Sequence, residues 1–216
     1  MEDLSTFSTE KLTDKELFAH IWLKPKKVFK YVTDYRYDKY TFIILIIAGI
    51  YRFIESSIDA SSAAGMAFKT KLIVSIIAGA LFGWLGYYVF AFLISFTAKW
   101  MGGKANTDYV VRVIAYALIP IIPALLCQFL LMYSIGDVFF MVEYDPTNYP
   151  FGHKPLNAIL ALMRDVFSLW SFILLIIATA TINNFGILKA ILNLILALVV
   201  IFIPLFILSV LFGNIF

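Results

Sequence analysis

The stretch KLIVSIIAGALFGWLGYYVFAFLISFTA, from Lys71 to Ala98, decides the fold of this 216-residue chain. After its first lysine it contains no charged residue. A helix needs about 20 mostly apolar residues to cross the ~30 Å hydrocarbon core of a bilayer. The stretch therefore predicts a helix that spans a membrane.

Four further apolar runs predict a polytopic all-α bundle of about five transmembrane helices. They are Thr41–Ile58, Val110–Tyr133, Val166–Ile182 and Ile187–Leu211. The first of them is the weakest, because charged residues occupy its second half, and four spans remain without it. The run that begins at Val166 is at the lower length limit unless it starts earlier, near Leu156.

The composition agrees with lipid as the main solvent. Apolar residues make up 62% of the chain and charged residues 14%, whereas a soluble domain has about 45–50% and about 25%. The net charge of +3 is too small to indicate nucleic-acid binding. The first expected partner is thus the bilayer itself, and nucleic acid is not expected.

The charge distribution predicts two regions and an orientation. Residues 1–40 form a polar tail followed by an amphipathic segment, and residues 41–216 form the five-span membrane domain. Most of the 17 basic residues fall in the N-terminal region, in the loop Lys99–Arg112 or at Lys189. Because basic loops stay in the cytoplasm, we expect a cytoplasmic N-terminus and a C-terminus outside.

The amphipathic segment has apolar and basic faces on either side of a proline. Phe18, Ile21 and Trp22 precede Pro25, and Val28, Phe29 and Val32 follow it, while the basic residues are Lys24, Lys26, Lys27 and Lys30. Such a helix can lie in the headgroup region of a membrane. The alternative is a short helix that packs on the membrane domain.

Arg52, Glu55 and Asp59 form a candidate polar site inside the first span. At 100° per residue they fall within about 60° of one another on one helix face. Charges in lipid are costly, so they normally pair or line a wet cavity and are functional candidates. The alternative is that the membrane ends near Tyr51 and the three residues lie in the headgroup region.

Small residues mark one stripe of the second span. Gly79 and Gly83 follow Ser75 in steps of four residues. Small side chains allow neighbouring membrane helices to approach closely. We interpret the stripe as a helix-packing face; the alternatives are a substrate groove and a docking face for another membrane protein.

Tyr116, Pro120 and Pro123 predict a distortion of the third span. Proline removes a backbone donor and clashes with the preceding turn, so the helix should kink or break near Ile119–Pro123. A kink is one interpretation. A broken helix that forms a midplane site, as in transporters, is the other.

Catalytic and metal-binding patterns are missing from the sequence. There is one cysteine, Cys127, and the two histidines, His20 and His153, have no second ligand at metal-site spacing. The chain also contains no Gly-rich phosphate loop. We therefore expect no enzyme, no cofactor and no metal.

Several segments resemble the Yip family, the Ypt/Rab-interacting membrane proteins, and especially its prokaryotic branch. They are the entry segment IWLKPKKVF (Ile21–Phe29), the second span with Gly79, Gly83 and Trp84, the link KWMGGK (Lys99–Lys104) and the segment AYALIP (Ala115–Pro120). The resemblance extends from about Ile21 to the C-terminus.

The resemblance implies a five-helix bundle without a cofactor, and its prokaryotic character implies a bacterial inner membrane. Eukaryotic members are linked to Rab GTPases and to vesicle formation. This chain lacks the Asp-Leu-Tyr-Gly-Pro type of motif associated with those members.

Two functions follow as hypotheses. The first is a non-enzymatic membrane protein that acts in membrane organisation, trafficking or partner recruitment, with other membrane proteins or a second copy as partners. The second is a small-solute or ion transporter or channel that uses the polar stripe of the first span.

Overall fold

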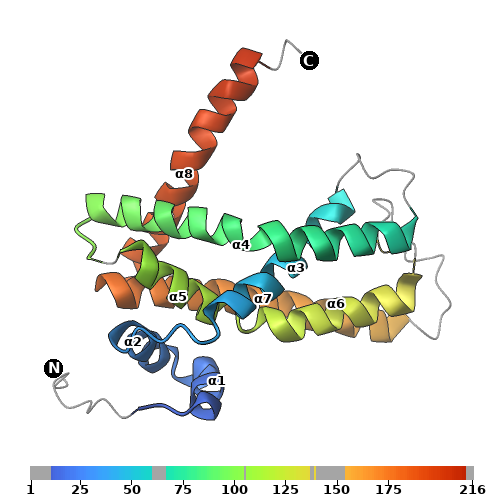
Figure 1. The fold of residues 1–216 in the computed structure, drawn as a ribbon, viewed down its shortest axis with the longest axis horizontal. Helices are drawn as coiled ribbons and strands as arrows, with labels where there is room; N and C mark the ends of the chain where they lie inside the picture. Colours follow the sequence, from blue (N-terminus) through green and yellow to red (C-terminus); the bar gives the residue numbers. More distant parts are fainter. Residues whose placement is uncertain (1–10, 60–66, 105, 137–138, 140–153, 213–216) are drawn as a thin grey trace.

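The computed structural model describes residues 11–59, 67–104, 106–136, 139 and 154–212. Within these ranges the chain forms eight α-helices and no strand (Figure 1), which confirms the predicted all-α class. They are α1 (Asp14–Leu23), α2 (Pro25–Asp34), α3 (Thr41–Asp59), α4 (Phe68–Trp100), α5 (Thr107–Ala117), α6 (Ile121–Ile135), α7 (Lys154–Asn183) and α8 (Ile187–Phe212). The first ten residues of the predicted tail lie outside the described part.

Three of the described helices are long and apolar enough to cross a membrane. They are α4, the segment Pro155–Asn183 of α7 and the segment Ile187–Pro204 of α8. The α5–α6 pair adds a fourth if it counts as one span. α7 starts before Leu156, so the fourth predicted span includes its early portion. α3 is not among these helices, and its crossing stays a prediction.

The third predicted span is broken where its prolines lie. α5 and α6 meet at an angle of 47°. Between them, the N–H of Ile121 donates to the carbonyl of Leu118 at 2.9 Å, and the N–H of Ile122 donates to the carbonyl of Ile119 at 3.0 Å. Bonds of this i→i−3 type tighten the chain into a turn. Pro120 has no N–H to continue an α-helix there, so the helix restarts in a new direction.

A direct backbone contact joins α3 to α4 through three glycines. A Cβ atom on Gly83 would lie 2.3 Å from the Cα atom of Gly49, and one on Gly79 would lie 2.8 Å from the Gly49 carbonyl oxygen. Both distances are too short for any side chain. The two backbones touch directly, which membrane helices use because lipid provides no hydrophobic drive for association.

A methyl group at this contact should force the two helices apart. We expect Gly83→Ala to lower the free energy of unfolding by about 1–3 kcal/mol, the usual cost of overpacking. Gly86→Ala is the matched control, because a Cβ atom there meets nothing within 4 Å. Thermal unfolding can be followed by maleimide-dye labelling of Cys127, the only cysteine, which is buried. Equal stability of the two variants would contradict the glycine contact.

The two N-terminal helices belong to the same core as the bundle. α1 begins with a capping box, in which the N–H of Thr13 donates to Glu16 at 2.8 Å and the N–H of Glu16 donates to the Thr13 hydroxyl at 3.4 Å. α2 restarts the helix with Pro25 at its first position. α2 packs against α5 and α7, and α1 packs against α2. The inward residues of the two helices are fully buried: Leu17, Ile21, Val28, Phe29 and Val32.

Asp14 fastens the start of α1 to the segment that leads into α3. Its carboxylate accepts hydrogen bonds from Lys39 Nζ and the Tyr40 hydroxyl, each at 2.6 Å, and from the Tyr37 hydroxyl. These donors, Lys39 foremost, hold the pKa of Asp14 far below its usual range. Burial, with the bond to Asp14 second, raises the pKa of Tyr37 to about 12.

Removing the charge of Asp14 should loosen α1. We expect faster hydrogen–deuterium exchange across Asp14–Leu23 in Asp14→Asn, and no change in the control Asp34→Asn, whose side chain is exposed. Because the folded-state pKa of Asp14 is lowered, its stabilisation is present above the unfolded value near 3.8 and is lost as the pH falls through the lower folded value. Protection of α1 that is identical in Asp14→Asn would contradict this role.

α8 leaves the bundle at a steep angle to α4 and α7 (Figure 1). Near its start, the side-chain amide of Asn193 donates to the Thr97 hydroxyl at 2.7 Å and to the carbonyl of Ile94 at 3.3 Å. Asn193 and Thr97 are both fully buried. This polar contact attaches the first turns of α8 to the last turns of α4.

Candidate functional site

The predicted polar stripe of the first span lies on the second half of α3. Arg52 and Glu55 approach to 3.9 Å, with 71% of the arginine side chain and 31% of the glutamate side chain exposed. The ion pair is therefore long and largely open. The side chain of Asp59 lies outside the described residues.

Tyr51 connects this stripe to α7. Its hydroxyl donates to a carboxylate oxygen of Glu55 at 2.8 Å and lies 2.8 Å from the Ser168 hydroxyl. Only 5% of Tyr51 is exposed. We refer to Tyr51, Glu55 and Ser168 as the α3–α7 clasp.

Two further polar contacts hold α3 on its other side. The hydroxyls of Ser57 and Ser75 are 2.6 Å apart, and the hydroxyl of Tyr87 donates to the carbonyl of Ala48 at 3.3 Å. Ser75 and Tyr87 both belong to α4. α3 is thus linked by hydrogen bonds to α4 and to α7, and it packs on α4 through the glycine contact.

Sequence reasoning identified Glu55 but missed its partners. The i, i+4 spacing of Tyr51 and Glu55 places them on one helix face and could have revealed the first bond. Ser168 is 117 residues away from Tyr51, and no local pattern indicates that they meet. Gly49, in the middle of a predicted span, was a recognisable signal for the partner of Gly79 and Gly83.

The remaining predicted site residues have structural contacts. Gly79 and Gly83 are covered by α3, so within the described chain their face packs internally. Tyr116 is fully buried, and its ring centroid lies 6.3 Å from that of Tyr37. Pro120 caps the start of α6, and Pro123 lies in its first turn.

Some residues of the predicted membrane-surface segment pack against the bundle, and others are exposed. The ring of Trp22 contacts that of Phe167 on α7 with centroids 6.0 Å apart, and Phe29 is fully buried. Pro25 starts α2, Lys26 is exposed and Lys27 is half-buried. Of the two interpretations of this segment, the geometry favours helices that pack on the bundle, with lysines on the outside.

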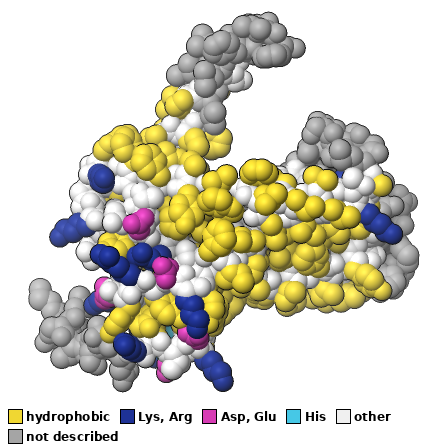
Figure 2. Space-filling model, viewed as in Figure 1, with side chains coloured by type: hydrophobic (Ala, Val, Ile, Leu, Met, Phe, Trp, Pro, Cys, Tyr) yellow, Lys and Arg dark blue, Asp and Glu magenta, His cyan; other side chains and the backbone are white. Residues whose placement is uncertain are grey.

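Charged side chains gather at one end of the molecule, over the N-terminal helices, whereas apolar side chains cover the length of the bundle (Figure 2). Exposed lysines occur in and beside the N-terminal helices, at Lys24, Lys26 and Lys30, and at and after the end of α4, at Lys99 and Lys104. Two of the segments predicted to be cytoplasmic thus carry exposed lysines.

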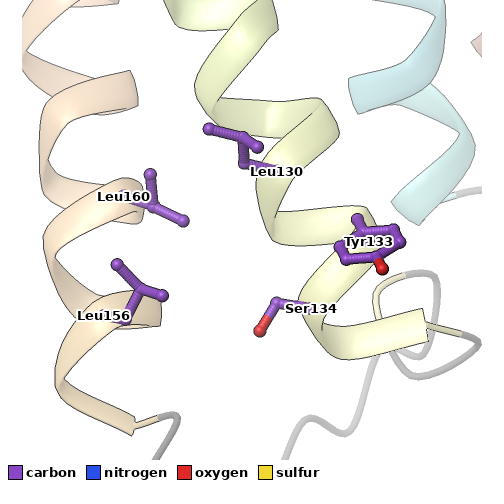
Figure 3. A pocket seen from close by; sticks show the side chains of 5 residues that line it. All are labelled: Leu130, Tyr133, Ser134, Leu156 and Leu160. Carbon is purple, nitrogen blue, oxygen red and sulfur yellow. The ribbon is translucent and has the colours of Figure 1, made fainter.

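The described cavity lies elsewhere. A groove of about 440 Å³ opens between α6 and α7 and is lined by Leu130, Tyr133, Ser134, Leu156 and Leu160 (Figure 3). It holds no charged group, and neither Arg52 nor Glu55 lines it. Among the described residues, no cluster of His, Cys, Asp or Glu could hold a metal ion.

A family model, the Yip1 domain, matches residues 19–209. No curated protein and no solved structure matches the chain. The family match spans nearly the whole sequence and agrees with a bundle of long apolar helices. The chain belongs to the Yip1 domain family and is a membrane protein, which confirms the resemblance seen in its sequence.

The α3–α7 clasp should contribute modestly to stability. Hydrogen bonds between membrane helices contribute about 0.6 kcal/mol on average, so we expect Tyr51→Phe and Ser168→Ala each to lower the free energy of unfolding by roughly this amount. Because both remove the same bond, the double variant should lose less than the two single losses combined.

Tyr88→Phe is the matched control for this cycle, because Tyr88 lies on α4 with much of its ring exposed. Thermal unfolding in detergent gives the comparison. Strictly additive losses would show that Tyr51 and Ser168 do not interact.

Proposed function

We propose that this protein is a non-enzymatic membrane scaffold that organises the bilayer or recruits partners through its N-terminal face. The observation that carries the proposal is that the two faces of α2 have different roles. Its apolar residues Val28, Phe29 and Val32 pack in the core, so Lys26 and Lys30 point outward from a helix that is fixed in place. Membership of the Yip1 domain family, which is not known for enzymes, supports the same function.

The proposal includes a topology. The first 40 residues form a cytoplasmic region in a bacterial inner membrane, followed by a five-span domain with its C-terminus outside. The lysines at the end of α4 and the start of α8 support this orientation, because basic residues are retained on the cytoplasmic side. Lys99, Lys104 and Lys189 are all exposed at these positions.

The proposal also gives the polar stripe of α3 a structural role. Glu55 is held by Tyr51, and Tyr51 by Ser168, so the acidic group joins two helices. Arg52 is mostly exposed, and a long arginine side chain can extend to the headgroup layer. Neither residue lines the described groove.

Reconstituted vesicles test the scaffold directly. We expect vesicle diameter, measured by cryo-electron microscopy, to fall as the protein-to-lipid ratio rises, because inserted bundles with a one-sided N-terminal region crowd one leaflet. The test uses the full-length protein, because deletion of residues 1–40 would remove core residues such as Phe29. Vesicles that keep the diameter of protein-free controls would contradict the scaffold.

The transporter hypothesis is the second candidate, favoured by the polar groups of α3. The same vesicles can be screened for flux of ions and small solutes. The scaffold predicts flux at the protein-free background. A flux that is lost in Glu55→Ala or Arg52→Ala would instead support transport.

A further inference from the structure

Asp165 is a charged residue in the middle of an apolar helix surface. On α7 it shares one face with Leu162, Leu169 and Phe172, which are three, four and seven residues away from it. All four side chains are more than half exposed. The exposed apolar surface begins at Ile159, so it extends for about 20 Å along the helix, with Asp165 near its centre.

This position leaves the Asp165 carboxylate short of partners. Exposed apolar side chains on a membrane-spanning helix face lipid, and a charge among them is costly unless it is paired. One oxygen of Asp165 accepts two hydrogen bonds from Arg164, at 2.9 Å from Nε and 2.8 Å from Nη2. The other oxygen has no hydrogen-bond donor among the described residues.

Arg52 lies at a similar level on the neighbouring helix α3. Tyr51 meets Ser168 at 2.8 Å. Arg52 and Asp165 are one and three residues further along in the same direction, because α3 ends on the side of the molecule where α7 begins (Figure 1). The guanidinium of Arg52 is 3.9 Å from Glu55, and 71% of its side chain is exposed. No described residue accepts a hydrogen bond from it.

Arg52 and Asp165 also face the same side of the α3–α7 pair. At about 100° per residue, Arg52 is turned about 100° from Tyr51, and Asp165 is turned about 60° from Ser168. Because the two helices run in opposite directions, both turns lead to the same side. One face of the bundle therefore presents a positive and a negative group on adjacent helices, at a similar depth, with exposed apolar side chains beside them.

We propose that this face, defined by Arg52, Leu162, Asp165 and Leu169, binds a second copy of the protein. A face with both charges at one depth is complementary to itself. A half-turn about an axis along the membrane normal places Arg52 of each copy against Asp165 of the other. The guanidinium then gains an acceptor, and the open carboxylate oxygen gains a donor. The inference goes beyond the proposed scaffold and does not depend on it.

A second copy fits this face better than lipid or an unrelated helix. Lipid tails offer no hydrogen-bond partner, and about 10 Å of apolar surface on either side of Asp165 separates it from the headgroups, which is beyond the reach of an aspartate. An unrelated membrane protein would need its own pair of opposite charges at this depth. A second copy has them by symmetry, and each pair forms charge-assisted hydrogen bonds, which are the strong ones.

Charge reversal tests the proposal in the full-length protein. Arg52→Asp and Asp165→Arg each place like charges against one another in a homodimer. Donor and acceptor dyes are attached through an N-terminal tag, and energy transfer is measured in liposomes as the protein-to-lipid ratio rises. We expect the unaltered protein to associate, and each variant to associate about a hundredfold more weakly, because like charges across an interface are strongly unfavourable.

Mixing the two variants gives the sharpest comparison. A copy with Arg52→Asp has two acidic groups on this face, and a copy with Asp165→Arg has two basic ones. We therefore expect the mixture to regain the energy transfer that neither variant shows alone. The contacts within each chain are not restored by mixing, so they cannot account for the recovery. Lys69→Asp, which reverses an exposed charge in the first turn of α4, is the control and should associate like the unaltered protein.

Random energy transfer by the unaltered protein at every ratio would overturn the proposal, as would association only with a different membrane protein. Association that survives both reversals would do the same. So would a mixture that stays monomeric although thermal unfolding shows both variants to be folded. If a reversed charge prevents folding, Arg52→Gln and Asp165→Asn replace the reversals, and each should weaken association about tenfold through loss of its charge-assisted bonds. Unchanged association in both would refute the proposal.

Discussion

The direct backbone contact between α3 and α4 is the constraint on which the rest of the bundle depends. Gly49 meets Gly79 and Gly83 at distances that leave no room for a methyl group. Because lipid provides no hydrophobic driving force for helix association, close packing and hydrogen bonds must supply the attraction. Because this contact fixes the rotation of α3, the Tyr51 hydroxyl meets Ser168 on α7 and the Ser57 hydroxyl meets Ser75 on α4.

The position of α3 also explains how two of its charged residues, Arg52 and Glu55, are accommodated. Glu55 belongs to the α3–α7 clasp, whereas the side chain of Arg52 is mostly exposed. The pair at 3.9 Å is too exposed to be a strong salt bridge. The hydrogen bonds of the clasp, rather than the ion pair, therefore fix the acidic group. A second polar contact, Asn193 with Thr97, fixes α8 in the same manner.

The sequence predicted local features well. Apolar runs located the long helices, two prolines located the break between α5 and α6, and the small-residue stripe located the packing face of α4. Each of these follows from residues within a few turns of one another. Even the division of α1 and α2 by Pro25 agrees with a local rule, since proline favours the first position of a helix.

Partners distant in the chain were not predictable in the same way. Nothing in the first span indicates that Tyr51 meets Ser168, because contacts between distant helices depend on their order and rotation. The same limit applied to Trp22. Its spacing fitted either a membrane surface or a protein core, and only the neighbouring helix α7, which supplies Phe167, distinguishes the two.

The central claim is that the polar groups between α3 and α7 hold helices together and do not line a water-filled path. Ser168→Cys in a Cys127→Ser background tests it most directly, in proteoliposomes treated with a membrane-impermeant thiol reagent from each side in turn. We predict no labelling from either side until the protein is unfolded. Rapid labelling in the folded protein would show that water reaches the clasp and would contradict this account.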